Sequence, residues 1–329
     1  MKRIRIVHIA LGMDVGGIEN LILSIARSID RHKFDFSVCC LDSGGILLRE
    51  VQKLGWYSYI LNRRPGFDWK LILQLANFFR KKRYHIVHTH NQASHFYGGI
   101  AAKLARVPVL VTTEHSRHYI DAKYRRRLEK LILAKISERW ITVSNELFDA
   151  SIKKDGLPQE KVMVIHNGID IEAFSRNIKT NLGALKESIG IPHEVKTVIM
   201  VARLHPIKNH AMLLRALSQL KGRASKLNVI FVGEGELKGE LISIGNHLKL
   251  NHRVHFVGLR QDIPDLLYMS DLFVLCSKTE GLPLSLLEAM AAKVPIMITE
   301  SANRAGLIIN GRNGIVVENS SIAIAEALD

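Results

Sequence analysis

Two glutamates, Glu280 and Glu288, lie on either side of a Gly-Leu-Pro turn in the segment TEGLPLSLLEAM, residues 279–290. Pro283 suits the first turn of a helix, because its missing N–H is not needed there. Glu280 therefore precedes the predicted helix, and Glu288 lies more than one turn inside it. Carboxylates accept hydrogen bonds well and a diol offers two donors, so this pair suits a ligand with hydroxyl groups at both ends.

The start of this predicted helix also favours anions. The apolar run 272–276 predicts a buried strand that leads into it. The peptide groups of Gly281 and Leu282 then lie at the helix N-terminus, where free N–H groups and the helix dipole attract negative charge. A nucleotide sugar has this shape, with hydroxyls on both sides of a diphosphate. A capped amphipathic helix with surface acids explains the same pattern without a ligand.

A pair of cations follows another predicted strand, in VARLHPIKNH at residues 201–210. Arg203 and Lys208 flank the loop that leaves this strand. A guanidinium forks onto phosphate oxygens and an ammonium acts as a point charge, so the two side chains suit a diphosphate. A solvated loop with two ordinary cations is the alternative interpretation.

The segment VGEGEL, residues 232–237, ends a further strand. Gly233 and Gly235 allow the backbone to approach a ligand closely. The dinucleotide spacing G-x-G-x-x-G fails because position 238 is Lys, and no G-x-x-x-x-G-K-[ST] loop is present. A turn between strand and helix is a sufficient explanation without a ligand.

In the first half of the chain, DVGGIEN at residues 14–20 lies between the first strand and the first helix. Gly16 and Gly17 form an open turn at a helix start. Their place at a strand end is where an open parallel sheet binds ligands.

Histidines gather in the middle of the first half. His88 and His90 lie on one face of a strand, and His115 follows the next strand. Imidazole is a common metal ligand, but no convincing carboxylate or thiolate set accompanies these side chains. We therefore expect a role for His90 or His115 in a substrate cleft, no metal site, and structural roles for His95 and His118.

Strands alternate with helices along the chain, which predicts parallel sheets covered on both faces. Ligands of such sheets bind at the carboxyl ends of the strands. We expect two doubly wound Rossmann-like α/β domains facing one cleft, residues 1–167 and 168–329, with a hinge near Asn167. Strands are expected at 4–10, 36–41, 86–89, 109–113 and 140–143, then at 198–202, 229–232, 254–257, 272–276 and 295–299.

Composition and charge limit the compartment and the kinds of partner that we expect for this protein. The three cysteines cannot form a disulfide framework, which favours a reducing cytosol. No apolar run approaches the length of a membrane span, and the first apolar stretch predicts a strand rather than a signal peptide. The net charge of +15 favours anionic partners. Nucleic acid is not expected, because the basic runs lack a recognisable binding module.

Taken in order, these segments resemble glycosyltransferase family 4, whose members have the GT-B fold and retain anomeric configuration. Each motif alone is a weak to moderate signal, but the ordered set is strong and covers nearly the whole chain. The motifs are GGIE at 16–19, TEHS at 113–116, VSN at 143–145, IHNGID at 165–170, ARLHPIKN at 202–209, VGEGEL at 232–237, VHFVG at 254–258 and EGLPLSLLEAM at 280–290.

The resemblance implies roles for individual residues. It implies that Arg203 and Lys208 grip the donor diphosphate, that Glu280 holds hydroxyls of the donor sugar, and that Glu288 binds the ribose. It also places His115 near the reacting sugar. The remaining donor-side expectations are Gly16, Gly17, Gly233, Glu234, Gly281, Leu282 and Pro283, and the acceptor-side expectations are Glu19, His90 and Asn91.

The implied reaction is transfer of a sugar from a nucleotide-diphosphate sugar to a glycan or lipid-linked acceptor, in bacterial polysaccharide, lipopolysaccharide or glycolipid synthesis. Retention without an enzyme nucleophile implies same-face attack, with no metal and no cofactor. The expected location is cytoplasmic, with peripheral attachment to the inner face of the cell membrane.

Two departures from the family pattern leave alternatives open. The stretch ESANRAGLIINGRNG, 300–314, lacks the usual Gly-Gly pair and the Glu expected there, and the chain ends at Asp329 before the family's usual return helices. A weakly active donor-binding homologue or scaffold subunit is one alternative, and a sugar-nucleotide epimerase on the same fold is another.

Two amphipathic segments predict docking on an anionic membrane. Residues 67–85 are expected to form a helix with an apolar stripe and a basic end, and residues 124–136 repeat the mixture. Coverage of the sheet explains the stripes alone, whereas the cations must face solvent. The stripe comprises Trp69, Ile72, Leu73, Ala76 and Phe79, and the cations that end it are Arg80, Lys81, Lys82 and Arg83.

Overall fold

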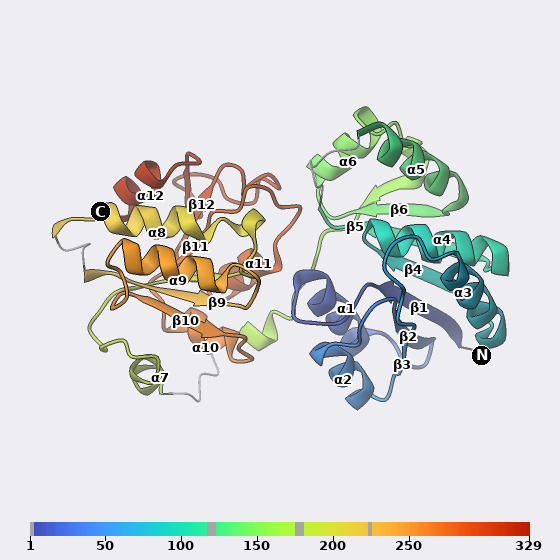
Figure 1. Cartoon of the computed structure of the whole chain (residues 1–329), viewed down its shortest axis with the longest axis horizontal. Coiled ribbons are helices and arrows are strands. Elements are labelled where there is room, and N and C mark those ends of the chain that lie inside the picture. The colour runs from blue at the N-terminus through green and yellow to red at the C-terminus, as the bar shows by residue number, and fades with distance from the viewer. Residues whose placement is uncertain (1–2, 117–122, 175–180, 223–225) are drawn as a thin grey trace. The chain divides into compact units, whose positions relative to one another are not determined.

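The computed structural model describes residues 3–116, 123–174, 181–222 and 226–329. The chain forms two compact units, Met1–Gly168 and Ile169–Asp329. The division lies one residue from the boundary expected above. Each unit is a parallel sheet with helices on its faces (Figure 1).

The first unit contains a seven-stranded sheet in the order β3-β2-β1-β4-β5-β6-β7, in which every neighbouring pair is parallel. Its strands are β1 (Ile4–Ala10), β2 (Phe34–Cys40), β3 (Tyr57–Ile60), β4 (Ile86–His90), β5 (Val109–Glu114), β6 (Arg139–Thr142) and β7 (Val162–Val164). Its helices are α1 (Gly17–Ser28), α2 (Ile46–Lys53), α3 (Trp69–Lys82), α4 (Gln92–Ala105), α5 (Lys123–Ile136) and α6 (Asn145–Lys153), with the 3-10 turn η1 (Gln159–Lys161).

Strand residues of the first sheet alternate between two cores, as a pleated strand covered on both faces requires. Val7 and Ile9 pack in the core that includes α3 and α4. Ile6 and Ala10, the alternate positions of the same strand, pack in the core that includes α1 and α2. His8 therefore points to the α1–α2 face, where its ring centroid lies 4.8 Å from that of Phe36.

The second unit contains a six-stranded parallel sheet in the order β10-β9-β8-β11-β12-β13 around one core. Its strands are β8 (Thr197–Val201), β9 (Asn228–Val232), β10 (Val254–Gly258), β11 (Leu272–Leu275), β12 (Ile296–Thr299) and β13 (Ile315–Val317). Its helices are α7 (Leu182–Ser188), α8 (His210–Gln219), α9 (Lys238–His247), α10 (Ile263–Tyr268), α11 (Leu284–Ala291) and α12 (Ser321–Leu328), with the 3-10 turns η2 (Glu172–Phe174) and η3 (Pro206–Lys208).

The structure of helix α3 shows that only part of the expected apolar stripe is exposed. Ile72, Ala76 and Phe79 are buried in the core of the first unit, so they cover the sheet. Trp69 and Leu73 remain 55% and 54% exposed. Only these last two residues of the stripe face outward. None of the helices in the described part of the chain is long and apolar enough to cross a membrane.

Candidate functional site

The loops after β8, β9 and β11 lie at the carboxyl edge of the second sheet and carry most of the expected donor-side residues. Two contacts tie the β11 loop to the β8 loop. Lys278 N donates to Ile207 O at 2.8 Å, and Cys276 Sγ lies 3.4 Å from Asn209 O. The β8 and β11 loops therefore form one connected surface.

Lys208 and Glu280 meet across these two loops. Lys208 Nζ donates to Glu280 Oε1 at 2.5 Å, and the two side chains are 26% and 10% exposed. The turn η3 carries Lys208 to this point, and the His205 side chain caps the turn by accepting from Ile207 N at 3.2 Å. An ammonium has three donors, so Lys208 can keep Glu280 and still contact an anion.

Glu288 is the fifth residue of α11, and its side chain is half-buried. Burial disfavours the charged form and raises the pKa of this carboxyl from its ordinary value of 4.5 to about 7. A carboxyl poised near neutrality gains from hydroxyl donors that reach it, because such donors stabilise the carboxylate. This property fits the ribose-binding role expected above.

Arg203 follows β8 and is exposed. Its guanidinium makes no ion pair or hydrogen bond with the residues that the structure describes. The side chain is therefore available to an external anion, whereas Lys208 is already held by a carboxylate.

Gly233 and Gly235 are required by close packing between loops. A Cβ on Gly233 would lie 2.3 Å from Ala202 O, and one on Gly235 would lie 2.3 Å from Leu204 O. Gly233 also has a φ of +139°, a conformation that side chains rarely adopt. Both glycines thus admit the backbone of the β8 loop, which accounts for them without a ligand. Glu234 between them pairs with Lys238 at 2.8 Å.

The start of α11 differs slightly from the expectation. Pro283 is the residue that precedes the first helical turn, with φ −70° and ψ 127°, and no side chain caps this helix. Gly281 and Leu282 are buried directly before it. Leu282 joins the interior, at 5% exposure, and its side chain cannot be a polar ligand.

In the first unit, the two glycines of the turn before α1 differ in the space around them. A Cβ on Gly16 would lie 2.3 Å from Glu19 Oε2, whereas a Cβ on Gly17 would meet nothing within 4 Å. The Glu19 carboxylate therefore folds back over the start of its own helix. Gly17 is the member of this pair that leaves room for a ligand.

Four imidazoles form a connected group on the α1–α2 face of the first sheet. His8 Nδ1 lies 2.8 Å from His90 Nε2, and His90 Nδ1 lies 3.0 Å from His115 Nε2. His88 stacks on His90 with ring centroids 4.4 Å apart and contacts Thr113 Oγ1 through Nε2 at 2.8 Å. Our sequence analysis did not include His8 in the group, because only the pairing of β1 with β4 brings His8 opposite His88.

Burial lowers the pKa of every member of this group. The pKa falls well below 6.5 for His8 and His90, to about 3 for His88 and to about 4 for His115. All four rings are therefore neutral at pH 7. His95 points to the other face, against Thr89 and Trp140, and His118 lies outside the described residues.

His8, His88 and His90 also bring ring nitrogens within 4.8 Å of one another, which is the spacing of a metal site. Both nitrogens of His90 are already engaged in hydrogen bonds with His8 and His115. A metal ligated by His90 would have to break one of them.

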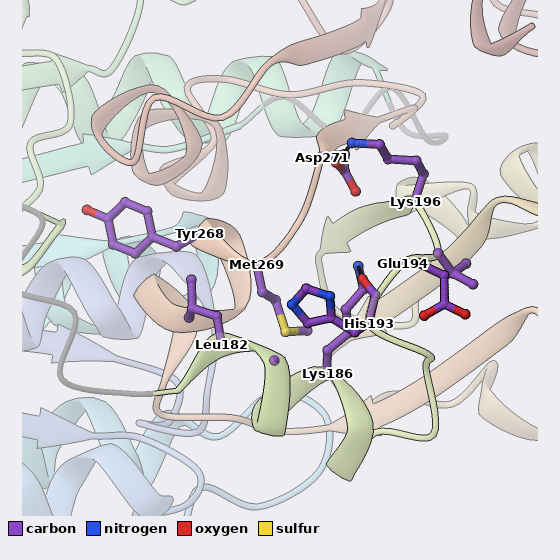
Figure 2. Close-up of a pocket in the computed structure, with 10 residues that line it drawn as sticks. Leu182, Lys186, His193, Glu194, Lys196, Tyr268, Met269 and Asp271 are labelled. Atoms are coloured by element: carbon purple, nitrogen blue, oxygen red, sulfur yellow. Dashed lines mark hydrogen bonds and ion pairs between the residues drawn. The ribbon is translucent and has the colours of Figure 1, made fainter.

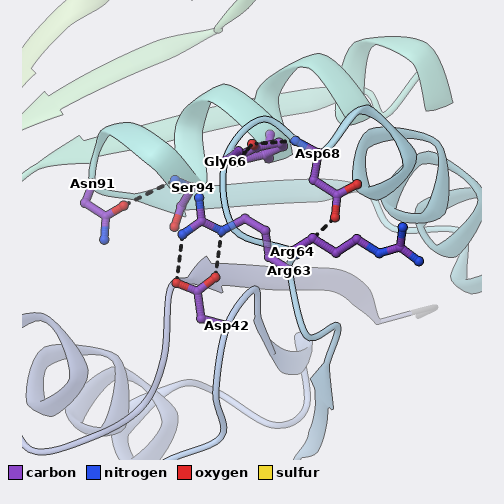
Figure 3. Close-up of polar contacts among 8 residues, drawn as sticks. Asp42, Arg63, Arg64, Gly66, Asp68, Asn91 and Ser94 are labelled. Carbon is purple, nitrogen blue, oxygen red and sulfur yellow. Dashed lines mark hydrogen bonds and ion pairs between the residues drawn. The ribbon is translucent and has the colours of Figure 1, made fainter.

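Asn91 serves as the cap of α4. Its side-chain oxygen accepts from Ser94 N at 3.2 Å, and its φ is +68° (Figure 3). The side-chain NH₂ is the part of Asn91 that remains for a ligand. In the same region Arg63 makes a two-pronged ion pair with Asp42, at 2.7 and 3.0 Å.

An open hollow in the second unit lies away from these loops. Figure 2 shows its lining, which includes Lys186, Lys196 and Asp271. Lys196 and Asp271 directly precede β8 and β11, so the hollow is at the amino edge of the sheet. Ligands of open parallel sheets bind at the opposite edge, so we do not assign the donor site to this hollow.

Two protein-family profiles match successive parts of the chain. The profile described as Glycosyltransferase Family 4 matches residues 15–173, and that described as Glycosyl transferases group 1 matches residues 183–329. The UDP-Gal:alpha-D-GlcNAc-diphosphoundecaprenol alpha-1,3-galactosyltransferase of Escherichia coli is 31% identical over 98% of this chain and 86% of its own length. The chain belongs to glycosyltransferase family 4. This glycosyltransferase is also 28% identical to the putative glycosyltransferase EpsF of Bacillus subtilis, over 90% of the chain and 79% of the relative.

Solved structures confirm the GT-B fold of the family 4 chain. The Anabaena protein HepE in complex with UDP and glucose aligns with a TM-score of 0.85 at 22% identity, over 99% of this chain and 89% of that chain. WaaG, a glycosyltransferase involved in lipopolysaccharide biosynthesis, aligns with a TM-score of 0.76 at 16% identity, over 98% and 90% of the two chains. The expected class of two Rossmann-like α/β domains is therefore confirmed. The family profiles and the Escherichia coli relative confirm the expectation of a glycosyltransferase.

Proposed function

We propose that this glycosyltransferase moves a sugar from a uridine-diphosphate sugar to a hydroxyl of a lipid-linked diphosphosugar, with retention of anomeric configuration. The observation that carries the proposal is the joined pair of loops after β8 and β11, which present Arg203, Lys208 and Glu280 ahead of the half-buried Glu288. The name of the Escherichia coli relative supports both the donor and the acceptor class.

Each donor-side residue has a role that its surroundings support. The exposed Arg203 forks onto the diphosphate, and Lys208 contacts it while holding Glu280. Glu280 accepts hydrogen bonds from hydroxyls of the donor sugar. Glu288 accepts from the ribose, whose hydroxyls offset the cost of ionising a buried carboxyl.

In the first unit, Gly17 provides open space beside the reacting groups, and His115 contacts the donor sugar. Glu19 at the start of α1, His90 in the imidazole group and Asn91 at the cap of α4 lie on the acceptor side of the reaction. The protein then acts by placing the two substrates and by stabilising charge on the leaving diphosphate. The diphosphate itself removes the acceptor proton, and Arg203 with Lys208 supplies positive charge without a metal.

A product assay tests this proposal. The protein is incubated with a panel of UDP- and GDP-sugars and a short-chain lipid diphosphosugar, and the product is analysed by NMR for the configuration of the new linkage. We expect free UDP and a glycosylated acceptor with retained configuration. An isomerised donor without transfer would establish the epimerase instead, and donor binding without turnover would establish the scaffold subunit.

We further propose that the helices α3 and α5 dock on an anionic membrane that holds the acceptor. Phe67 and Trp69 are 69% and 55% exposed near the basic Lys70 at the start of α3, and the last turn of the same helix carries the exposed Lys81. On α5, Ile132 is 55% exposed. Exposed apolar groups among cations suit an anionic leaflet, where each cation contributes about 1 kcal/mol.

Liposome co-sedimentation tests the docking. The double variant Lys70→Glu with Lys81→Glu should lose binding to anionic vesicles. The control pair, Lys221→Glu with Lys249→Glu, makes the same change in net charge on exposed lysines of the second unit and should keep it. Equal loss in both double variants would refute docking through α3, because net charge alone would then govern binding.

A further inference from the structure

The three imidazoles of His8, His90 and His115 form a linear chain with one buried end. The His8–His90 and His90–His115 contacts are 2.8 and 3.0 Å. His8 Nε2, at the inner end, is buried without a hydrogen-bond partner among the described residues. At the outer end His115 is partly exposed, and its Nδ1 has no partner in the described part of the chain.

A chain of neutral imidazoles can carry its protons in only two arrangements. Each neutral ring has one N–H donor and one acceptor nitrogen, so each contact needs one of each. Either every ring donates outward, from His8 to His90 to His115, or every ring donates inward. The arrangement of one ring therefore determines the arrangement of the other two.

The buried end distinguishes the two arrangements. If the rings donate inward, His8 Nε2 carries a buried N–H with no acceptor. If they donate outward, the same atom is an unpaired lone pair. Buried N–H groups without a partner are the rarer case in proteins, because such a donor keeps its full desolvation cost. The outer end does not oppose this preference, since water or a ligand can either donate to His115 Nδ1 or accept from it.

We infer that His8 and His90 are positioning residues that hold His115 in the Nδ1–H tautomer, so that His115 presents a hydrogen-bond donor rather than a base to its ligand. This tautomer is the reverse of the one that free histidine prefers in water. Burial also keeps the pKa of His115 low, so the ring is a neutral donor across the physiological range.

The inference deepens the proposed function, on which its consequence for catalysis rests. A neutral N–H donor can hold a hydroxyl or an ester oxygen of the donor sugar without taking a proton from the acceptor. It leaves proton removal to the departing diphosphate. His115 is then a group that binds and orients the sugar.

Nitrogen NMR of the free protein tests the tautomer without any substrate. Ring nitrogens that carry a proton and those that do not have well-separated ¹⁵N shifts, and His115→Gln identifies the His115 signals. At pH 7 we expect Nδ1 of His115 to be protonated and Nε2 not, with an excess on the order of tenfold. An Nε2–H signal for His115 in the unmodified protein would overturn the inference.

Two substitutions of His90 provide the matched comparison. His90→Leu removes the donor to His115 Nε2, so His115 should shift toward the Nε2–H tautomer. His90→Asn can place its amide N–H near the position of Nδ1 and should keep the Nδ1–H tautomer. A His115 tautomer that is the same in both variants would overturn the positioning role. Should either variant fail to fold, the spectrum of the unmodified protein still decides.

Turnover separates this inference from the proposed function. We expect His90→Leu to lower kcat by on the order of tenfold with little change in KM for the donor, and His90→Asn to restore most of it. An Nδ1–H tautomer together with an unchanged rate in His115→Gln would support the positioning chain and refute the catalytic use of His115. An Nε2–H tautomer in an active enzyme would refute the chain alone.

Discussion

Replacement of Glu288 by Gln should stabilise the second unit at alkaline pH. The folded pKa of this carboxyl is about 7, against an ordinary value of 4.5. Between these values the native state holds a proton that the unfolded state has released. Stability contributed by the neutral carboxyl is therefore fully present below about pH 4.5 and is lost as the pH rises to 7. Glutamine keeps the shape and has no proton to lose.

The magnitude follows from the pKa difference. Each pKa unit corresponds to about 1.36 kcal/mol, and a difference of roughly 2.5 units gives about 3.4 kcal/mol as the limit. Because the side chain is not fully buried, we expect the gain from Glu288→Gln to be about 2–3 kcal/mol larger at pH 8 than at pH 5. This corresponds to roughly 4–12 °C in Tm for a unit of this size.

The assay uses the uneven distribution of tryptophan. Trp56, Trp69 and Trp140 all lie in the first unit, so intrinsic fluorescence reports that unit alone. Far-UV circular dichroism reports both units. Glu288→Gln should shift the dichroism transition at pH 8 and leave the fluorescence transition in place, which makes fluorescence the internal control.

Binding of UDP should stabilise the unmodified protein more than the Glu288→Gln variant. The variant lacks the carboxylate acceptor for ribose, so saturating UDP should raise its Tm less than that of the unmodified protein.

A stability gain from Glu288→Gln that is equal at pH 5 and pH 8 would refute the reasoning, because a buried ionisable carboxyl requires the gain to depend on pH.

The remaining predictions concern the other charged groups. Arg203→Ala should weaken UDP-sugar binding by about 30–150-fold in calorimetry, while Arg215→Ala on the exposed side of α8 should leave it unchanged. Glu280→Gln should lower kcat more than it changes the Kd for UDP, and equal effects on the two would contradict its contact with the sugar. A chelator should leave activity intact, and loss that a divalent ion restores would show a metal requirement. The stability of the first unit, measured by fluorescence, should be constant above pH 6.5 and should fall as the pH drops toward 4. Each buried neutral histidine, such as His88 and His115, should lower the free energy of unfolding by about 1.4 kcal/mol per pH unit, because the unfolded chain takes up protons that the folded chain does not.

The central strands could be predicted because they are largely buried on both faces and their sequences are mainly apolar. β1 spans the predicted residues 4–10, and β12 is buried at all four positions. The edge strands β3, β7 and β13 were not predicted. They have only three or four residues and are partly exposed, so their sequences lack a continuous apolar run.

The donor-side residues could be proposed from the sequence because they follow strands whose carboxyl ends share an edge. The pairing of Lys208 with Glu280 could not be predicted, since it depends on how two loops separated by about seventy residues pack. The role of His8 was missed for the same reason, because the side chain lies mid-strand in an apolar run. For the glycines after β9 the sequence left open a ligand or a simple turn, and the structure shows a neighbouring loop packed against them.

The packing of that neighbouring loop has a consequence for engineering. Gly233 and Gly235 admit the backbone after β8, and Lys278 N donates to Ile207 O of the same loop. The loops after β8, β9 and β11 therefore pack as one unit, and lengthening or replacing one of them would displace the other two. An engineering experiment that replaces one of these loops therefore has to carry the other two with it.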